Sequence, residues 1–106
     1  MGVIKTVLRE ELENSLRMKG QYERELAKLP KGSLVARNIK GHVYYYLIMR
    51  EDGKFRSIYK GKSVPEREQK KYAEAKRLRA KYRKALSKLK KQIRYLEGAL
   101  RGKEPI

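Results

Sequence analysis

Apolar residues in the last third of the chain recur at steps of three and four, the spacing of one face of a helix. Between Glu66 and Gly102 only Gly98 disfavours a helix, and only Arg79 interrupts the apolar series. The series consists of Tyr72, Ala75, Tyr82, Leu86, Leu89, Ile93, Leu96 and Leu100. Pro65 suits the first helical position. The pattern predicts a long helix over residues 65–101 that buries one edge against a partner.

A second series with the same spacing predicts a first helix over residues 3–29. Its members are Leu8, Leu12, Ser15, Tyr22, Leu26 and Leu29. A glycine inside a helix lowers helix stability by about 1 kcal/mol relative to alanine. The sequence therefore leaves open whether the helix kinks or breaks near Gly20. Both helices are too long to be covered by a small sheet, so we expect them to pair as an antiparallel coiled-coil hairpin.

Alternating apolar and polar residues over 33–61 predict a three-stranded antiparallel meander between the helices. The strands are expected over 33–39, 42–50 and 54–61. Together with the helices this gives an α+β protein, which we expect to form a single domain over residues 1–106.

The turns set the register of the predicted sheet. A two-residue turn at Lys40-Gly41 places Ala36 opposite Tyr45, and a three-residue turn over 51–53 places Tyr59 opposite Tyr45. One face is then the expected core: Leu34, Ala36, Val43, Tyr45, Leu47, Met49, Phe55 and Tyr59. The outer face is aromatic and basic: Val35, Arg37, Tyr44, Tyr46, Ile48, Arg50, Lys54, Arg56, Ile58 and Lys60.

The charge of the chain changes the functional picture. The net charge is +17, and the last 45 residues carry 16 Lys and Arg against 5 acids. Charge of one sign at this density repels itself unless an anion lies against it. We therefore expect a nucleic acid, DNA over RNA, as the partner. The expected phosphate contacts on the long helix are Lys70, Arg77, Lys81, Lys84, Lys88 and Lys91. The alternative is an ordinary solvated helix face, where Lys and Arg are common.

The outer face of the sheet is the second expected contact surface. Tyrosine rings suit bases, and cations suit phosphates. The residues expected there are Arg37, Tyr44, Tyr46, Arg50, Arg56 and Lys60. The alternative is an exposed sheet face that carries strand-favouring residues and charges without a partner.

Several short stretches carry a resemblance to known domains: Lys31-Gly32-Ser33, residues 41–47, Arg50, Gly53-Lys54 and residues 59–62. They resemble a small uncharacterised domain of bacterial and archaeal proteins linked to mobile elements. Less closely, they resemble the arm-type DNA-binding domain of tyrosine integrases, which lays a three-stranded sheet in the major groove. The resemblance implies groove contacts by Arg37, Tyr44, Tyr46, Arg50 and Arg56. The integrase domain has one short helix where this chain has long ones.

Catalysis has little support in the sequence. His42 and Asp52 are the only residues of their kinds, and each lies beside a turn. There is no Ser–His–Asp set, no metal-spaced histidine pair and no phosphate loop. We expect no enzyme activity, no metal and no cofactor. The chain has no cysteine and no apolar run near the ~20 residues that span a bilayer. We therefore expect a cytoplasmic protein, and the scarcity of Asn and Gln resembles thermophile usage.

Surplus apolar residues favour a rival class of function. The two apolar series would meet along one line of contact between the helices, which we call the seam. Other apolar residues of the helices lie outside these series and exceed what one seam can bury: Val3, Ile4, Val7, Leu16, Met18, Leu78, Ala85 and Ala99. This surplus fits a protein–protein interaction module, such as a mobile-element-encoded inhibitor of a nucleic-acid-binding partner. It fits a homodimer equally well.

Overall fold

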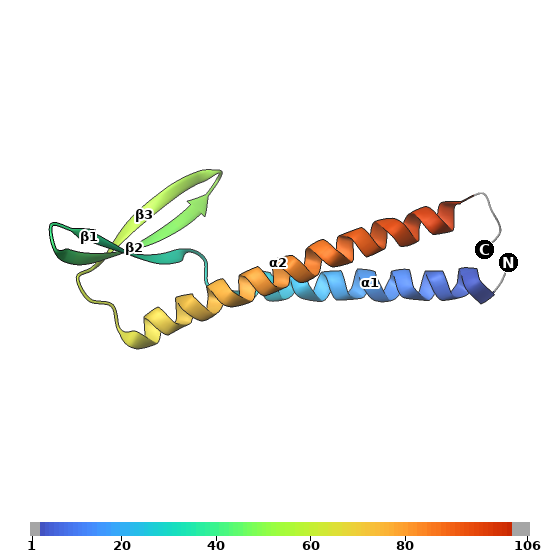
Figure 1. Ribbon diagram of the computed structural model, residues 1–106, viewed down its shortest axis with the longest axis horizontal. Helices are drawn as coiled ribbons and strands as arrows, with labels where there is room; N and C mark the ends of the chain where they lie inside the picture. Colours follow the sequence, from blue (N-terminus) through green and yellow to red (C-terminus); the bar gives the residue numbers. More distant parts are fainter. Residues whose placement is uncertain (1–2, 103–106) are drawn as a thin grey trace. The chain divides into compact units, whose positions relative to one another are not determined.

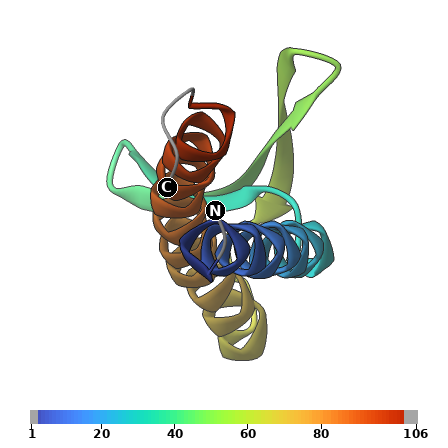
Figure 2. The ribbon, with the colours of Figure 1, turned by 90° about the vertical axis from the view of Figure 1, so that its right-hand side faces the viewer.

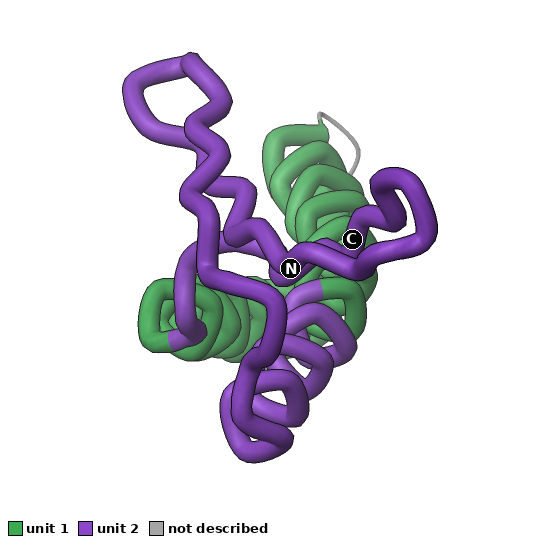
Figure 3. Tube along the Cα trace, turned by 90° about the vertical axis from the view of Figure 1, so that its left-hand side faces the viewer, with its two compact units in different colours: residues 1–28, 80–106 green, residues 29–79 purple. Residues whose placement is uncertain are grey.

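A computed structural model describes residues 3–102 and divides them into two compact units, which Figure 3 colours separately. Unit 1 combines residues 3–28 with 80–102, and unit 2 comprises residues 29–79. The elements in order are α1 (Val3–Lys28), β1 (Ser33–Ile39), β2 (His42–Glu51), β3 (Lys54–Gly61) and α2 (Glu66–Arg101), as labelled in Figure 1. The predicted α+β class is confirmed. The expectation of one domain over residues 1–106 stays a prediction.

Unit 1 consists of α1 and the C-terminal part of α2, which run in opposite directions (Figure 1). The rings of Tyr22 and Tyr82 meet with their centroids 5.7 Å apart. Ser15 is the one buried residue of α1, and its small side chain suits a close approach of two helices. The buried residues of this part of α2 are Leu86, Leu89, Ile93 and Leu96. Both predicted seams are therefore the least exposed sides of their helices.

The path of the helices differs in detail from the expectation. α1 runs without a break through Gly20. Figure 2 shows that the two helices cross at an angle. The α+β arrangement is therefore clear, while regular coiled-coil pairing stays a prediction.

Unit 2 contains the sheet, in the order β1-β2-β3 with antiparallel pairing throughout. The first hairpin has the predicted register, with Ala36 opposite Tyr45. Its two turn residues have positive φ, 51° at Lys40 and 83° at Gly41, as a type I′ turn requires. The Asn38 side-chain oxygen accepts a hydrogen bond from the Gly41 N–H at 3.0 Å.

The predicted register of the second hairpin is wrong by one residue. Asp52 and Gly53 form a two-residue turn with φ of 49° and 78°, so Glu51 pairs with Lys54 and closes the ladder. The sequence Glu51-Asp52-Gly53 suits both turn lengths. A three-residue turn needs one residue in the left-handed region, which Gly53 supplies, and a two-residue turn needs two, which is possible because Asp also tolerates that region. The predicted three-residue turn moved every β3 side chain to the wrong face.

The corrected register changes the membership of both faces. Tyr59 lies opposite Tyr46 and Phe55 lies opposite Arg50, so both belong to the outer face. Arg56 lies opposite Met49 and Ile58 opposite Leu47, so both belong to the inner face. The sheet then has an irregularity, because Tyr46 pairs with Tyr59 while Tyr45 pairs with Gly61. This leaves Lys60 as the extra residue of a β-bulge.

Contacts at the ends of the sheet fix the loops of unit 2. Gly32 has a φ of +98°, and a Cβ there would lie 2.9 Å from the Leu47 side chain, so only glycine fits. Arg79, which interrupts the apolar seam of α2, donates a hydrogen bond from Nη2 to the Pro30 carbonyl oxygen at 2.8 Å. The buried apolar residues of this unit are Leu47, Val64 and Ala75.

The burial pattern of α2 predicts which substitutions destabilise unit 1. Leu89→Ala and Ile93→Ala each remove a buried side chain and should lower the free energy of unfolding by about 2–4 kcal/mol. Lys84→Ala changes an exposed position and should change it by less than about 0.5 kcal/mol. Urea unfolding followed by circular dichroism measures all three. Similar losses in all three variants would contradict the seam.

Two glycines form a matched test of the second turn. Gly53→Ala forces an alanine into positive φ and should destabilise the protein by about 1–2 kcal/mol. Gly98 lies in α2 with open space around it, so Gly98→Ala should stabilise the protein by up to about 1 kcal/mol. Thermal melting compares the two. An unchanged or higher melting temperature for Gly53→Ala would contradict the positive φ at Gly53 on which the two-residue turn depends.

Candidate nucleic-acid interface

The cations of α2 fall into two groups by their ion pairing. Before Arg79, two of the five cations have carboxylate partners on the same helix: Lys70 Nζ lies 3.3 Å from Glu66, and Arg77 Nη2 lies 2.6 Å from Glu74. Residues 80–101 carry eight Lys and Arg against one acid, Glu97. No ion pair forms in this segment within residues 3–102. The C-terminal part of α2 therefore concentrates the unpaired charge.

The pair between Arg77 and Glu74 is the better formed of the two. The guanidinium donates from Nε to Oε2 at 3.1 Å and from Nη2 to Oε1 at 2.6 Å. These hydrogen bonds, together with the charge of Arg77, hold the pKa of the Glu74 carboxyl below its usual value. Both side chains of this pair are exposed, so solvent screens the attraction between them. A phosphate could therefore compete for Arg77, although Arg77 already has a partner.

Burial of the α2 seam fixes which cations face outward. We use the name basic stripe for Lys81, Lys84, Lys88 and Lys91, which are all exposed and follow each other at steps of three, four and three. At helical rise the stripe is about 15 Å long. Tyr95 continues the same line four residues further and is 73% exposed. A side chain with a ring and a hydroxyl thus lies at the end of a row of ammonium groups.

Sequence reasoning omitted some cations from the candidate contacts. Arg83, Lys90 and Arg94 are exposed on the other flank of the seam in the same segment. Their spacing of seven and four residues from one another, which is one face of a helix, was readable in the sequence. The structure adds that they too have no carboxylate partner within the described residues.

Three tyrosines cluster on the outer face of the sheet. We call Tyr44, Tyr46 and Tyr59 the aromatic platform. The Tyr59 ring lies 5.5 Å from that of Tyr46 and 6.3 Å from that of Tyr44, measured between centroids. The three rings and Ile39 line a shallow hollow of about 330 Å³. The sequence predicted two of these tyrosines on this face and missed Tyr59, because its register depends on the second turn.

Arginines accompany the aromatic residues of this face. The Arg37 guanidinium carbon lies 5.3 Å from the Tyr46 ring centroid, and that of Arg50 lies 5.7 Å from the Phe55 ring centroid. These distances are typical of cation–π contacts. The outer face therefore brings together Arg37, Tyr44, Tyr46 and Arg50 as expected.

Two of the cations expected on this face lie elsewhere. Arg56 belongs to the inner face and donates a hydrogen bond from Nη1 to Glu51 at 3.1 Å. The Lys60 ammonium lies 3.4 Å from the Glu68 carboxylate at the start of α2. The expected placement of Arg56 on the outer face is therefore wrong, whereas Lys60 is the bulge residue and is paired with a carboxylate of α2.

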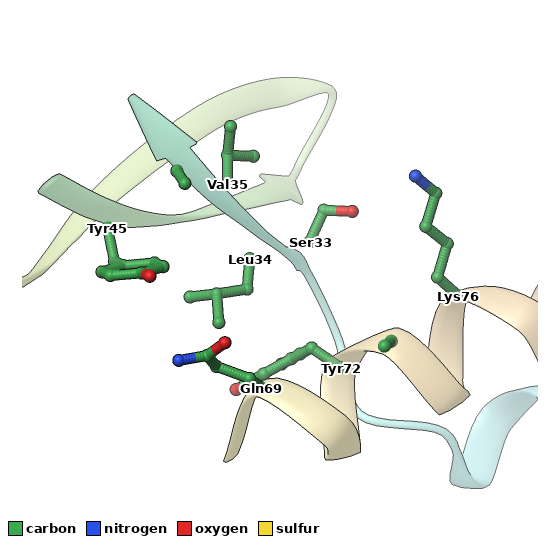
Figure 4. Close-up of a pocket in the computed structure, with 9 residues that line it drawn as sticks. Ser33, Leu34, Val35, Tyr45, Gln69, Tyr72 and Lys76 are labelled. Atoms are coloured by element: carbon green, nitrogen blue, oxygen red, sulfur yellow. The ribbon is translucent and has the colours of Figure 1, made fainter. Parts of the chain in front are cut away.

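The inner face of the sheet borders a second hollow, of about 450 Å³, shown in Figure 4. Leu34 and Tyr45 extend from the strands towards Gln69 and Tyr72 of α2. Helix α2 thus lies on the inner side of the sheet within unit 2. The aromatic platform belongs to the opposite face.

Other kinds of site find no support in the described part of the chain. Residues 3–102 contain no group of three His, Cys, Asp or Glu side chains that could hold a metal ion. Within the same range, neither helix has the length and apolar character needed to cross a membrane.

Comparison with known proteins identifies the family. The family model described as "Domain of unknown function (DUF6788)" matches residues 7–71, more than half of the chain, and the chain belongs to this family. The match spans the whole sheet and ends before the basic stripe. No curated protein and no solved structure matches the chain.

Proposed function

We propose that this member of the DUF6788 family binds nucleic acid, with duplex DNA as its partner, through phosphate contacts from the basic stripe of α2. The observation that carries this proposal is the segment of residues 80–101, where eight cations accompany one acid and form no ion pair within the described chain. Duplex DNA carries one negative charge per roughly 1.7 Å of its axis and supplies the missing counter-charge.

The chemistry of the stripe suits a sequence-independent contact. Lysines bind phosphates as flexible point charges, whereas base edges are read mainly by bidentate arginine, asparagine or glutamine. The four stripe residues are all lysines. The resemblance of the sheet to mobile-element-linked domains and to the integrase arm-type domain supports DNA as the nucleic acid.

The proposal predicts a steep dependence of affinity on salt. With ~5–8 phosphate contacts, the slope of log K against log salt concentration should be roughly −4 to −7. Changing Lys84, Lys88 and Lys91 together to Gln should weaken binding to all sequences alike and flatten the slope by about 2–3. Fluorescence anisotropy with labelled duplexes of different sequence, at several salt concentrations, gives the slopes.

A matched control separates the stripe from net charge. The triple variant Lys5→Gln, Lys19→Gln and Lys28→Gln removes the same charge from α1. It should leave the slope nearly unchanged, because none of the three lysines belongs to the basic stripe and, within residues 3–102, the only ion pair lost is the exposed one between Lys28 and Glu25. Equal slopes for the wild type and the stripe variant would remove α2 from the interface, and equal losses in both triple variants would reduce the effect to net charge.

A protein–protein interaction module is the second candidate, and exposed apolar side chains on α1 favour it. Val3, Ile4, Val7 and Leu16 are 80%, 58%, 50% and 47% exposed. A second copy or another protein could cover them. Sedimentation of the purified protein distinguishes the two cases, since a self-associating surface gives a dimer whose fraction rises with concentration.

A further inference from the structure

We propose that the aromatic platform binds an unpaired stretch of nucleic acid by stacking its bases on Tyr44, Tyr46 and Tyr59. This inference rests on the proposed function, because it assumes a nucleic-acid partner, and it adds a second kind of contact. The stripe holds phosphates, and the platform holds base faces.

The geometry of the platform favours ring faces over groove contacts. Neighbouring centroids lie 5.5 Å and 6.3 Å apart with interplanar angles of 53° and 49°, so the rings are tilted and leave gaps beside one another. Tyr59 is 54% exposed. Bases inside a duplex have their faces covered by their neighbours, and only an unpaired strand offers faces to a protein.

The composition of the outer face also argues against direct reading of a duplex groove. Groove readers present several side chains that pair with base edges, such as arginine, asparagine and glutamine. Here Arg37 and Arg50 lie against the rings of Tyr46 and Phe55. A guanidinium held against a ring extends a flat surface for stacking.

Charge identifies the occupant as a polyanion instead of an apolar protein segment. Residues 33–62 carry seven Lys and Arg against two acids, Glu51 and Asp52. One of these acids, Glu51, already pairs with Arg56. Within unit 2, α2 lies on the other face of the sheet, where Leu34 and Tyr45 approach Gln69 and Tyr72 (Figure 4). Within unit 2 the platform is thus a partly exposed aromatic surface, with Tyr59 exposed and Tyr44 and Tyr46 half-buried, and Arg37 lies against one of its rings.

A comparison of oligonucleotides tests the platform with the wild-type chain. The probes are an oligothymidylate, an oligouridylate, an abasic strand of equal length and a blunt duplex, each followed by fluorescence anisotropy at one salt concentration. Base stacking should make the oligothymidylate bind roughly 5- to 150-fold more tightly than the abasic strand for each stacked base. Equal affinities for these two strands would overturn the platform. The oligouridylate separates RNA from DNA.

Substitutions locate the effect on the sheet. Tyr46→Leu with Tyr59→Leu keeps apolar side chains but removes two rings, and should lower the affinity for oligothymidylate while leaving that for the blunt duplex unchanged. The matched control, Tyr46→Phe with Tyr59→Phe, keeps the rings and should retain most single-strand binding. Equal loss with the Leu and Phe pairs would assign the effect to the hydroxyls and overturn stacking. Melting curves first establish that the Leu double variant is folded. Stacking would then also be overturned if that variant lost single-strand and duplex binding to the same extent.

The same measurements separate failure of this inference from failure of the proposed function. If the duplex binds, and the abasic strand and the oligothymidylate bind with equal affinity, the proposed phosphate contacts of the basic stripe are retained and base stacking on the platform is ruled out. If neither duplex nor single strand binds, both fall. Quenching of tyrosine fluorescence by the oligothymidylate but not by the duplex supports the platform without any substitution, since the chain has no tryptophan.

Discussion

Burial of the α2 seam is the interaction on which the rest of the structure depends. Leu86, Leu89, Ile93 and Leu96 are each 8% exposed or less. Burying a side chain of this size stabilises the protein by about 1.5–3 kcal/mol. A pair of like charges four residues apart on a helix costs only about 0.2–0.5 kcal/mol. Burial therefore outweighs the repulsion between the lysines and fixes the rotation of the helix. That rotation directs the basic stripe outward.

The parts of the fold that depend on local pattern were predictable from the sequence. The three-four spacing of apolar residues identified both helices, and the buried residues of unit 1 belong to the two predicted seams. The first hairpin was also predictable, because Lys40-Gly41 suits a two-residue turn and the apolar faces of both strands agree with it. Arg79 interrupts the seam for a reason that the sequence does not show, its bond to the Pro30 carbonyl.

The second hairpin was not predictable for a physical reason. Glu51-Asp52-Gly53 suits turns of two or three residues, and the wrong choice looked favourable because it placed Phe55 and Tyr59 in the core. In the structure Phe55 is 74% exposed. The small sheet leaves this large apolar ring on its outer face, and turn geometry prevails over hydrophobic pattern. The aromatic platform depends on that choice, so sequence reasoning could locate only two of its three rings.

Ion pairing divides the cations expected to bind nucleic acid into those with a carboxylate partner and those without one, and only some of these pairs could be predicted from the sequence. The pairs of Lys70 with Glu66 and Arg77 with Glu74 follow helical spacing and were readable. The pair of Lys60 with Glu68 joins a strand to a helix and depends on the bulge. Four of the cations in the sheet and at the start of α2 have a carboxylate partner, namely Arg56, Lys60, Lys70 and Arg77. Within residues 3–102, the cations of α2 after Arg79 have none.

A nuclear magnetic resonance titration of the isotope-labelled chain with a short blunt DNA duplex tests nucleic-acid binding through α2 most directly. It shows which amides change environment, residue by residue, without any substitution. Binding through the basic stripe predicts that the largest shift changes follow Lys81, Lys84, Lys88 and Lys91 and weaken as salt is added. Shift changes confined to the exposed apolar residues of α1, or no change at all at low salt, would contradict it.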